Sequence, residues 1–165
     1  MSAPESSLPG RSEARGRQLL RERAACEFWT REKLRNADTD QFRHINNAAI
    51  ATLFEAARME ILEHDSLKAS MAGRNVVVAH LSIDFLKELY FPGTVEIGSA
   101  TLDVGRTSFQ LLQGLFIGSE CVASARATCV VLDTQRGVPT LVPEPVRSHL
   151  LKGRADENAS VGGRI

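Results

Sequence analysis

The sequence has 165 residues, of which 43% are hydrophobic and 24% are charged. These values indicate a single globular domain, long enough to bury a sizeable core. Lysine plus arginine number 20, as do aspartate plus glutamate, so the charge gives no support for nucleic acid or an anionic membrane as a partner. No apolar run approaches the roughly 18 residues that a membrane-spanning helix needs.

Three cysteines, Cys26, Cys121 and Cys129, are present. An odd number without paired spacing argues against a disulfide framework and against a zinc site. We therefore expect free thiols, which fit a reducing compartment. The sequence predicts a cytoplasmic protein that needs no metal and no other cofactor.

Residues 1–24 are predicted to form a disordered or short helical arm ahead of the domain. Residues 1–10 are rich in Ser, Pro and Gly, and residues 11–24 are charged throughout without an apolar segment, which excludes a secretory signal. The arginines would suit an organelle transit peptide, but the glutamates count against that alternative. The domain is expected over residues 25–152, and the Gly-rich residues 153–165 are expected to be a disordered tail.

The first half of the domain predicts a strand, a turn and a long helix. Aromatic and β-favouring residues over 26–35 predict the strand, and residues 36–44 are polar and turn-like. Asn46 is a good N-cap for a helix over 47–64. Alanines surround much of this helix, so we expect burial on several sides. Its apolar residues recur at helical spacing on one face: Ile50, Leu53, Phe54, Ala57 and Ile61.

After a predicted loop over 65–75, apolar residues recur at every second position instead of at helical spacing. Residues 76–89 alternate, which predicts a strand with one apolar face formed by Val77, Ala79, Leu81, Ile83 and Phe85. Further strands are predicted over 94–104, 107–117 and 121–132, and the tight turns between them indicate antiparallel pairing. Pro145 is well placed to start a short helix through Leu151.

One helix between a first strand and four later strands predicts an α+β fold, in which a curved antiparallel sheet wraps around one long central helix. Such a sheet can be completed by pairing its edge, or by packing its helix layer, against a second copy. We therefore expect a homodimer or a larger assembly.

A polar cluster lies where the first strand leads into the helix: Asp38, Asp40, His44, Asn46 and Asn47. A helix N-terminus presents unpaired N–H groups and a partial positive charge, which can hold a developing oxyanion. Asp and Asn are also standard turn and N-cap residues. Composition alone therefore favours a structural cap over a catalytic site.

The spacing within the cluster resembles that of the hot-dog thioesterases related to 4-hydroxybenzoyl-CoA thioesterase. The resemblance rests on Asp40, followed after three residues by His44-Ile45-Asn46-Asn47-Ala48, and on Glu55-Ala56-Ala57-Arg58 in the helix. It continues through residues 80–86, 95–98, 104–109 and 123–133. Two positions depart from the pattern. Arg43 stands where some members have Gly, and Ile50 stands where many have an aromatic residue.

The resemblance implies the hot-dog fold and hydrolysis of an acyl-CoA or acyl carrier protein thioester. It assigns Asp40 as the nucleophile or general base, which the sequence does not separate. The backbone N–H of Asn47 would polarise the carbonyl, and His44 either orients the reacting groups or only caps the helix. Glu55 either faces the same cavity or pairs with Arg58.

The phosphates of CoA require cations, for which Arg74, Lys87 and Arg106 are candidates, with Ser108 beside them; each also fits a solvated surface position. Ile50 is expected to shape the acyl pocket. The resemblance implies a homodimer or homotetramer with an acyl-CoA substrate. Two alternatives stay open: a non-catalytic acyl-CoA-binding subunit, and a hot-dog hydratase, whose Asp-to-His spacing of five differs from the four found here.

Overall fold

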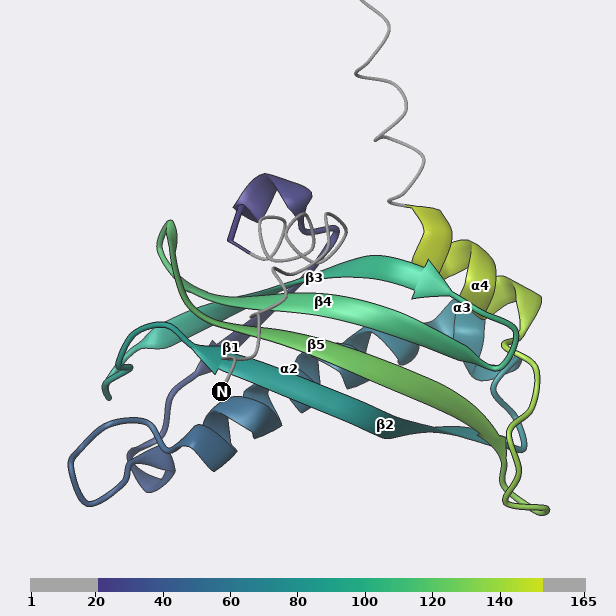
Figure 1. Ribbon diagram of the computed structural model, residues 1–165, viewed down its shortest axis with the longest axis horizontal. Coiled ribbons are helices and arrows are strands. Elements are labelled where there is room, and N and C mark those ends of the chain that lie inside the picture. The colour runs from purple at the N-terminus through teal and green to yellow at the C-terminus, as the bar shows by residue number, and fades with distance from the viewer. Residues whose placement is uncertain (1–20, 153–165) are drawn as a thin grey trace, which may run out of the picture.

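The computed structural model describes residues 21–152 (Figure 1). The strands are β1 (Phe28–Lys33), β2 (Arg74–Phe85), β3 (Thr94–Val104), β4 (Ser108–Ile117) and β5 (Glu120–Asp133). The long helix is α2 (Asn47–Leu62), and the shorter helical segments are η1 (Arg23–Ala25), η2 (Asn36–Asp38), α3 (Asp65–Lys68) and α4 (Glu144–Leu151).

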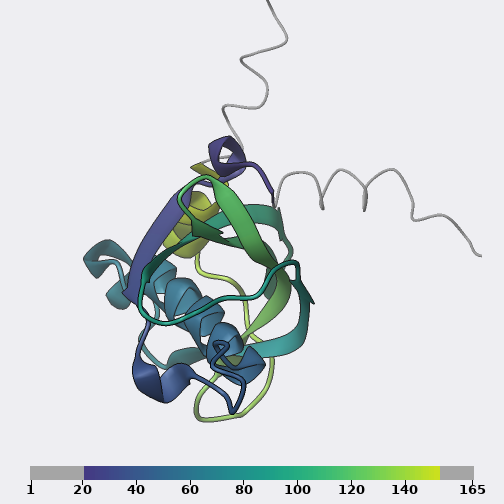
Figure 2. The same ribbon diagram turned by 90° about the vertical axis from the view of Figure 1, so that its left-hand side faces the viewer.

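The five strands form one antiparallel sheet in the order β1-β3-β4-β5-β2. Helix α2 runs along one face of the sheet, and the end view shows the strands curling around it (Figure 2). This arrangement confirms the predicted α+β fold, a curved antiparallel sheet around one long helix, which is the hot-dog fold. The hairpins from β3 to β5 separate β1 from β2, so these two strands form the edges.

The core lies between α2 and the concave face of the sheet. One apolar cluster surrounds Phe54 near the middle of α2, and a second surrounds Ile61 at its end. On the helix between them lies Arg58, whose Nη1 donates to Gln113 Oε1 at 2.9 Å. Gln113 Nε2 in turn donates to the Phe54 carbonyl oxygen at 3.1 Å. A hydrogen-bonded polar layer therefore crosses the core beneath the helix.

Strand β2 differs from its predicted alternation. Val78 pairs with Cys129 and His80 pairs with Thr128 on β5, which leaves Ala79 as an extra residue in a β-bulge. A bulge reverses the alternation of the residues that precede it. The inward face therefore carries Val76 with Leu81, both packed against the second cluster. The prediction that Val77 shares the face of Leu81 was wrong, because the sequence pattern alone does not reveal the bulge.

Several boundaries also differ. The first strand is shorter than predicted, and β2 ends at Phe85 rather than near residue 89. The predicted loop over 65–75 contains the one-turn helix α3, whose N-cap His64 accepts from Ser66 N–H. Most of the predicted arm and the whole predicted tail lie outside the described residues. No helix within 21–152 combines the length and the apolar character needed to cross a membrane.

Candidate active site

The segment between β1 and α2 forms a narrow hairpin that leads directly into the helix. Asp40 N–H donates to the His44 carbonyl at 2.8 Å, and Asn46 N–H donates to the Asp38 carbonyl at 2.8 Å. These two bonds fold the polar cluster back on itself. Because the Asp38 carbonyl bonds the N-cap residue Asn46, Asp40 lies only two residues further along the hairpin from the start of the helix.

The carboxylate of Asp40 is held by its own turn. Its Oδ1 accepts from the N–H groups of Phe42 at 2.8 Å and His44 at 3.1 Å. This is the turn geometry that aspartate favours. No hydrogen bond from residues 21–152 reaches Oδ2. The loop therefore fixes a partly buried carboxylate and leaves one oxygen available for a reacting group.

The start of α2 lies beside this carboxylate. The side-chain oxygen of Asn46 accepts from Ala48 N–H at 2.8 Å, which confirms the predicted N-cap. The cap occupies the Ala48 donor, whereas the Asn47 N–H has no acceptor among the described residues. A free N–H at a helix N-terminus, aided by the helix dipole, can stabilise negative charge on a carbonyl oxygen.

Arg43 closes the turn in an unusual conformation. Its φ is 68°, the left-handed region, and its N–H donates to the Asp40 carbonyl at 3.1 Å. Glycine adopts this conformation readily, whereas other L-residues do so at a cost. The turn thus explains why glycine suits the position before His44, and the arginine here holds the same backbone under strain.

His44 has neighbours that the sequence analysis missed. Its Nε2 lies 3.8 Å from Oε2 of Glu88, and its ring packs edge-to-face against Tyr90 with centroids 5.0 Å apart. Both neighbours come from the segment after β2, more than 40 residues away in the sequence. The sequence signal was the alternation of polar Glu88 and Tyr90 around the apolar Leu89.

Glu55 and Ile50 take different environments on α2. Glu55 is exposed, and no ion pair within 4.0 Å joins it to Arg58 in the described part of the chain. The expected pair is absent because Arg58 turns inward to Gln113, and burial lowers the pKa of this guanidinium. Ile50 is 3% exposed and belongs to the first core cluster.

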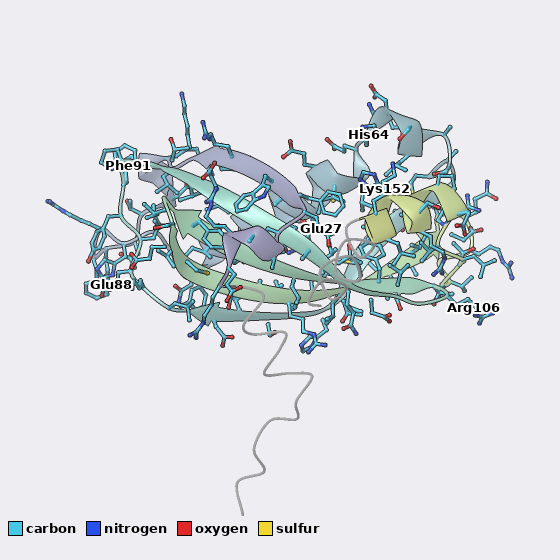
Figure 3. The ribbon with its side chains drawn as sticks, turned by 90° about the horizontal axis from the view of Figure 1, so that it is seen from above. Glu27, His64, Glu88, Phe91, Arg106 and Lys152 are labelled. Atoms are coloured by element: carbon cyan, nitrogen blue, oxygen red, sulfur yellow. The ribbon has the colours of Figure 1, made fainter. Side chains whose placement is uncertain are left out.

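The proposed phosphate-binding residues are not gathered around Asp40 within one chain. Lys87 lies near, but its ammonium pairs with Glu120. Arg106 lies at the end of the molecule opposite Glu88 (Figure 3), and Ser108 follows it at the start of β4. Arg74 begins β2 and bonds the Ser70 carbonyl at 3.2 Å.

A cleft of about 520 Å³ opens beside the N-cap, between the end of β1, η2 and one face of α2. Its volume suits a small organic ligand. Asp38 forms part of its wall and pairs with Arg35 at 2.6 Å, and this hydrogen-bonded pair lowers the pKa of the Asp38 carboxyl. Asp38 is therefore a structural turn residue. The helix contributes small and apolar side chains to the cleft, namely Ala48, Ala49, Thr52, Leu53 and Ala56.

None of the three cysteines lines this cleft. No disulfide joins Cys26, Cys121 or Cys129, and burial raises the pKa of Cys26 to about 11. A thiol with so high a pKa is a poor nucleophile at neutral pH. Within residues 21–152, no group of three or more His, Cys, Asp or Glu side chains is arranged to hold a metal ion.

Comparison with known proteins places this geometry in a family. The chain resembles a thioesterase from Thermus thermophilus solved with coenzyme A and zinc, with 26% identity, a TM-score of 0.67 and coverage of 76% of this chain and 98% of the other. The YbaW probable thioesterase from Escherichia coli is similar at 25% identity, a TM-score of 0.67 and coverage of 75% and 96%. The PA5185 protein from Pseudomonas aeruginosa shares the fold at 23% identity, a TM-score of 0.73 and coverage of 78% and 92%. The model of the thioesterase-like superfamily matches residues 34–150, and the chain therefore belongs to that superfamily.

Proposed function

We propose that the protein hydrolyses an acyl-CoA thioester to a carboxylic acid and free CoA. The observation that carries the proposal is the Asp40 carboxylate, which two backbone N–H groups hold in the hairpin that leads into α2. The N–H of Asn47, the first residue of α2, has no acceptor among the described residues. A carboxylate and an oxyanion donor are the two groups that thioester hydrolysis needs most. A thiol with a pKa near 8.5 leaves as a thiolate without a strong general acid.

Asp40 can act in two ways. As a general base, its Oδ2 takes a proton from water while the water oxygen attacks the thioester carbonyl carbon. As a nucleophile, Oδ2 attacks that carbon to give a mixed anhydride, which water then hydrolyses. In both routes the Asn47 N–H binds the carbonyl oxygen as it becomes negative, and the carbon–sulfur bond breaks with its electron pair on sulfur.

The choice of CoA is supported by the Thermus thermophilus thioesterase, which was solved with coenzyme A. An acyl carrier protein thioester is the second substrate class, since it presents the same reacting atoms. A non-catalytic acyl-CoA-binding subunit is the second function, which the departures at Arg43 and Ile50 leave open. A hydratase has less support, because the superfamily matched is thioesterase-like.

Thiol release from a panel of acyl-CoAs, followed with a thiol reagent, tests the function directly. Asp40→Asn is the informative variant, because an asparagine Oδ1 can accept the same two N–H bonds and preserve the turn. We expect its kcat to fall at least about a hundredfold. Asp65→Asn is the control, since Asp65 is exposed and bonds only Lys68 in the described structure. Full activity in Asp40→Asn would remove Asp40 from the reaction. No release by the wild type would favour the binding subunit.

We also propose that the working unit is a homodimer formed through β2. The sheet leaves the outer edge of this 12-residue strand without a partner among the described strands, and an exposed edge readily pairs with another chain. Antiparallel pairing of two β2 edges would set the Arg74 end of one copy beside the Phe85 end of the other. That places Arg74 near the partner's Asp40 site, as expected for a phosphate contact. Light scattering that gives the mass of one chain would contradict the dimer.

The cytoplasmic location remains a proposal that rests on the thiols. None of the three cysteines forms a disulfide, although Cys26 and Cys121 are only partly buried. Free thiols persist most readily in a reducing compartment. Cell fractionation with an antibody to the chain tests this directly, and recovery in a membrane-enclosed oxidising compartment would contradict it.

A further inference from the structure

The segment after β2 is joined to the Asp40 hairpin by backbone pairing. Ile45 N–H donates to the Leu89 carbonyl at 2.7 Å, and His44 forms a β-bridge with Tyr90. Side chains along an extended chain point alternately to opposite sides. Ile45 and Leu89 are accordingly buried, at 3% and 1% exposed. The side chains of His44, Glu88 and Tyr90 therefore emerge together on the outer side.

These three side chains contact one another. Tyr90 Oη donates to Glu88 Oε2 at 2.5 Å, which fixes that carboxylate and raises the pKa of the phenol. The same Oε2 lies 3.8 Å from His44 Nε2. The ring planes of Tyr90 and His44 meet at 87°, which is an edge-to-face contact. The Tyr90 ring thus packs against the imidazole of His44, and Nε2 of the imidazole faces the Glu88 carboxylate.

We propose that Glu88 is a positioning residue for His44 in the thioester-hydrolysing site. A carboxylate that faces Nε2 favours the neutral tautomer with the proton on Nε2, which leaves Nδ1 as a hydrogen-bond acceptor. Because His44 N–H bonds Asp40 Oδ1 at 3.1 Å, the ring is attached to the loop that holds the catalytic carboxylate. Tyr90 acts through Glu88. This role rests on the proposed function.

The other charged groups around His44 do not supply this effect. On its own hairpin, Asp40 forms no ion pair within 4.0 Å of a His44 ring nitrogen in the described residues, and Arg43 is a cation. On the packed segment, Lys87 is also a cation and pairs with Glu120. Cations do not attract the Nε2 proton. Glu88 is the carboxylate within 4.0 Å of the ring in the part of the chain that the structure describes.

Nitrogen-15 NMR of the His44 side chain, at a pH where the ring is neutral, tests the proposal without any substrate. We expect the wild type to show the tautomer protonated on Nε2, and Glu88→Gln to show a mixture. The variant is informative because a glutamine oxygen can still accept from Tyr90 while the charge is lost. Tyr90→Phe, which releases Glu88, should shift the mixture in the same direction.

Kinetics provide the second measurement. An exposed ion contact of this kind supports about a twofold to fivefold fall in kcat for Glu88→Gln, with KM unchanged. Glu120→Gln is the matched control, since Glu120 is also exposed and pairs with Lys87 of the same segment. An unchanged tautomer in Glu88→Gln would overturn the proposal. A wild type that releases no thiol would refute the hydrolase function, and the NMR result would still decide the role of Glu88.

Discussion

Arg43→Gly should stabilise the protein, although it removes an arginine from a hairpin beside the proposed site. Within residues 21–152, Arg43 is the only residue other than glycine with a positive φ, at 68°. Its side chain is exposed and forms no ion pair within 4.0 Å with the rest of the described chain. The substitution therefore changes little except the backbone preference of one residue.

The magnitude follows from two opposing terms. A left-handed conformation costs an L-residue about 1–2 kcal/mol, which glycine does not incur. Glycine also loses more conformational freedom on folding, which costs about 0.5–1 kcal/mol. The difference predicts a gain of roughly 0.5–1 kcal/mol in the free energy of unfolding. For a chain of this size that corresponds to a rise in Tm of about 1–4 °C.

Chemical denaturation by urea, followed by circular dichroism, measures this gain. The control is Arg136→Gly, because Arg136 is an exposed turn residue with an ordinary φ and its N–H donates to Asp133 Oδ1 at 2.9 Å. There the entropic cost of glycine applies without any relief of backbone strain, and we expect a loss of about 0.5–1 kcal/mol. The two variants should thus shift stability in opposite directions. A loss in Arg43→Gly as large as that in Arg136→Gly would refute the strain argument.

Three further predictions concern the sheet and the core. Gly98→Ala would place a Cβ 2.5 Å from Cys26 Sγ and 2.9 Å from the Trp29 ring. We therefore expect the free energy of unfolding, measured in urea, to fall by about 1–3 kcal/mol. An unchanged unfolding midpoint would contradict this packing. Gln113→Leu alone leaves the buried Arg58 guanidinium without its hydrogen-bond partner and should cost about 1.5–3 kcal/mol, whereas the double variant with Arg58→Met should recover most of that loss. No recovery would show that the two do not act as a pair. Burial raises the pKa of Cys26 to about 11, so only about one Cys26 thiol in a thousand is ionised at pH 8. Iodoacetamide should therefore alkylate Cys26 much more slowly in the native than in the unfolded protein. Mass spectrometry that finds equal alkylation rates would contradict this.

Local chemistry explains which parts of the fold the sequence could predict. Asn46 was recognisable as an N-cap because its side chain bonds Ala48 N–H only two residues away. Strand β3 has the predicted bounds, since turn residues delimit it on both sides. The bulge at Ala79 was not predictable, because it depends on the register between β2 and β5, and these strands are about 50 residues apart in the sequence.

The same distinction applies to the site. Asp40, His44 and Asn47 lie within one short segment, so their proximity follows from a single hairpin and could be expected from their spacing. Glu88 and Tyr90 reach that hairpin only because the sheet brings the end of β2 back beside it. The phosphate contacts predicted at Arg74 and Arg106 stay predictions, because neither residue joins the Asp40 hairpin within one chain.

The hairpin and its neighbouring segment thus divide the site between short-range and long-range contacts. Asp40 is fixed by N–H groups of its own turn, and the helix start is fixed by the Asn46 cap, so the hydrogen bonds that hold these two groups are local. His44 is different, because its ring is oriented by Glu88 and Tyr90 from another part of the sheet. Changes near Glu88 should therefore alter the orientation of the imidazole while the Asp40 carboxylate and the Asn47 N–H stay in place. This separation allows the contribution of His44 to be measured apart from that of Asp40.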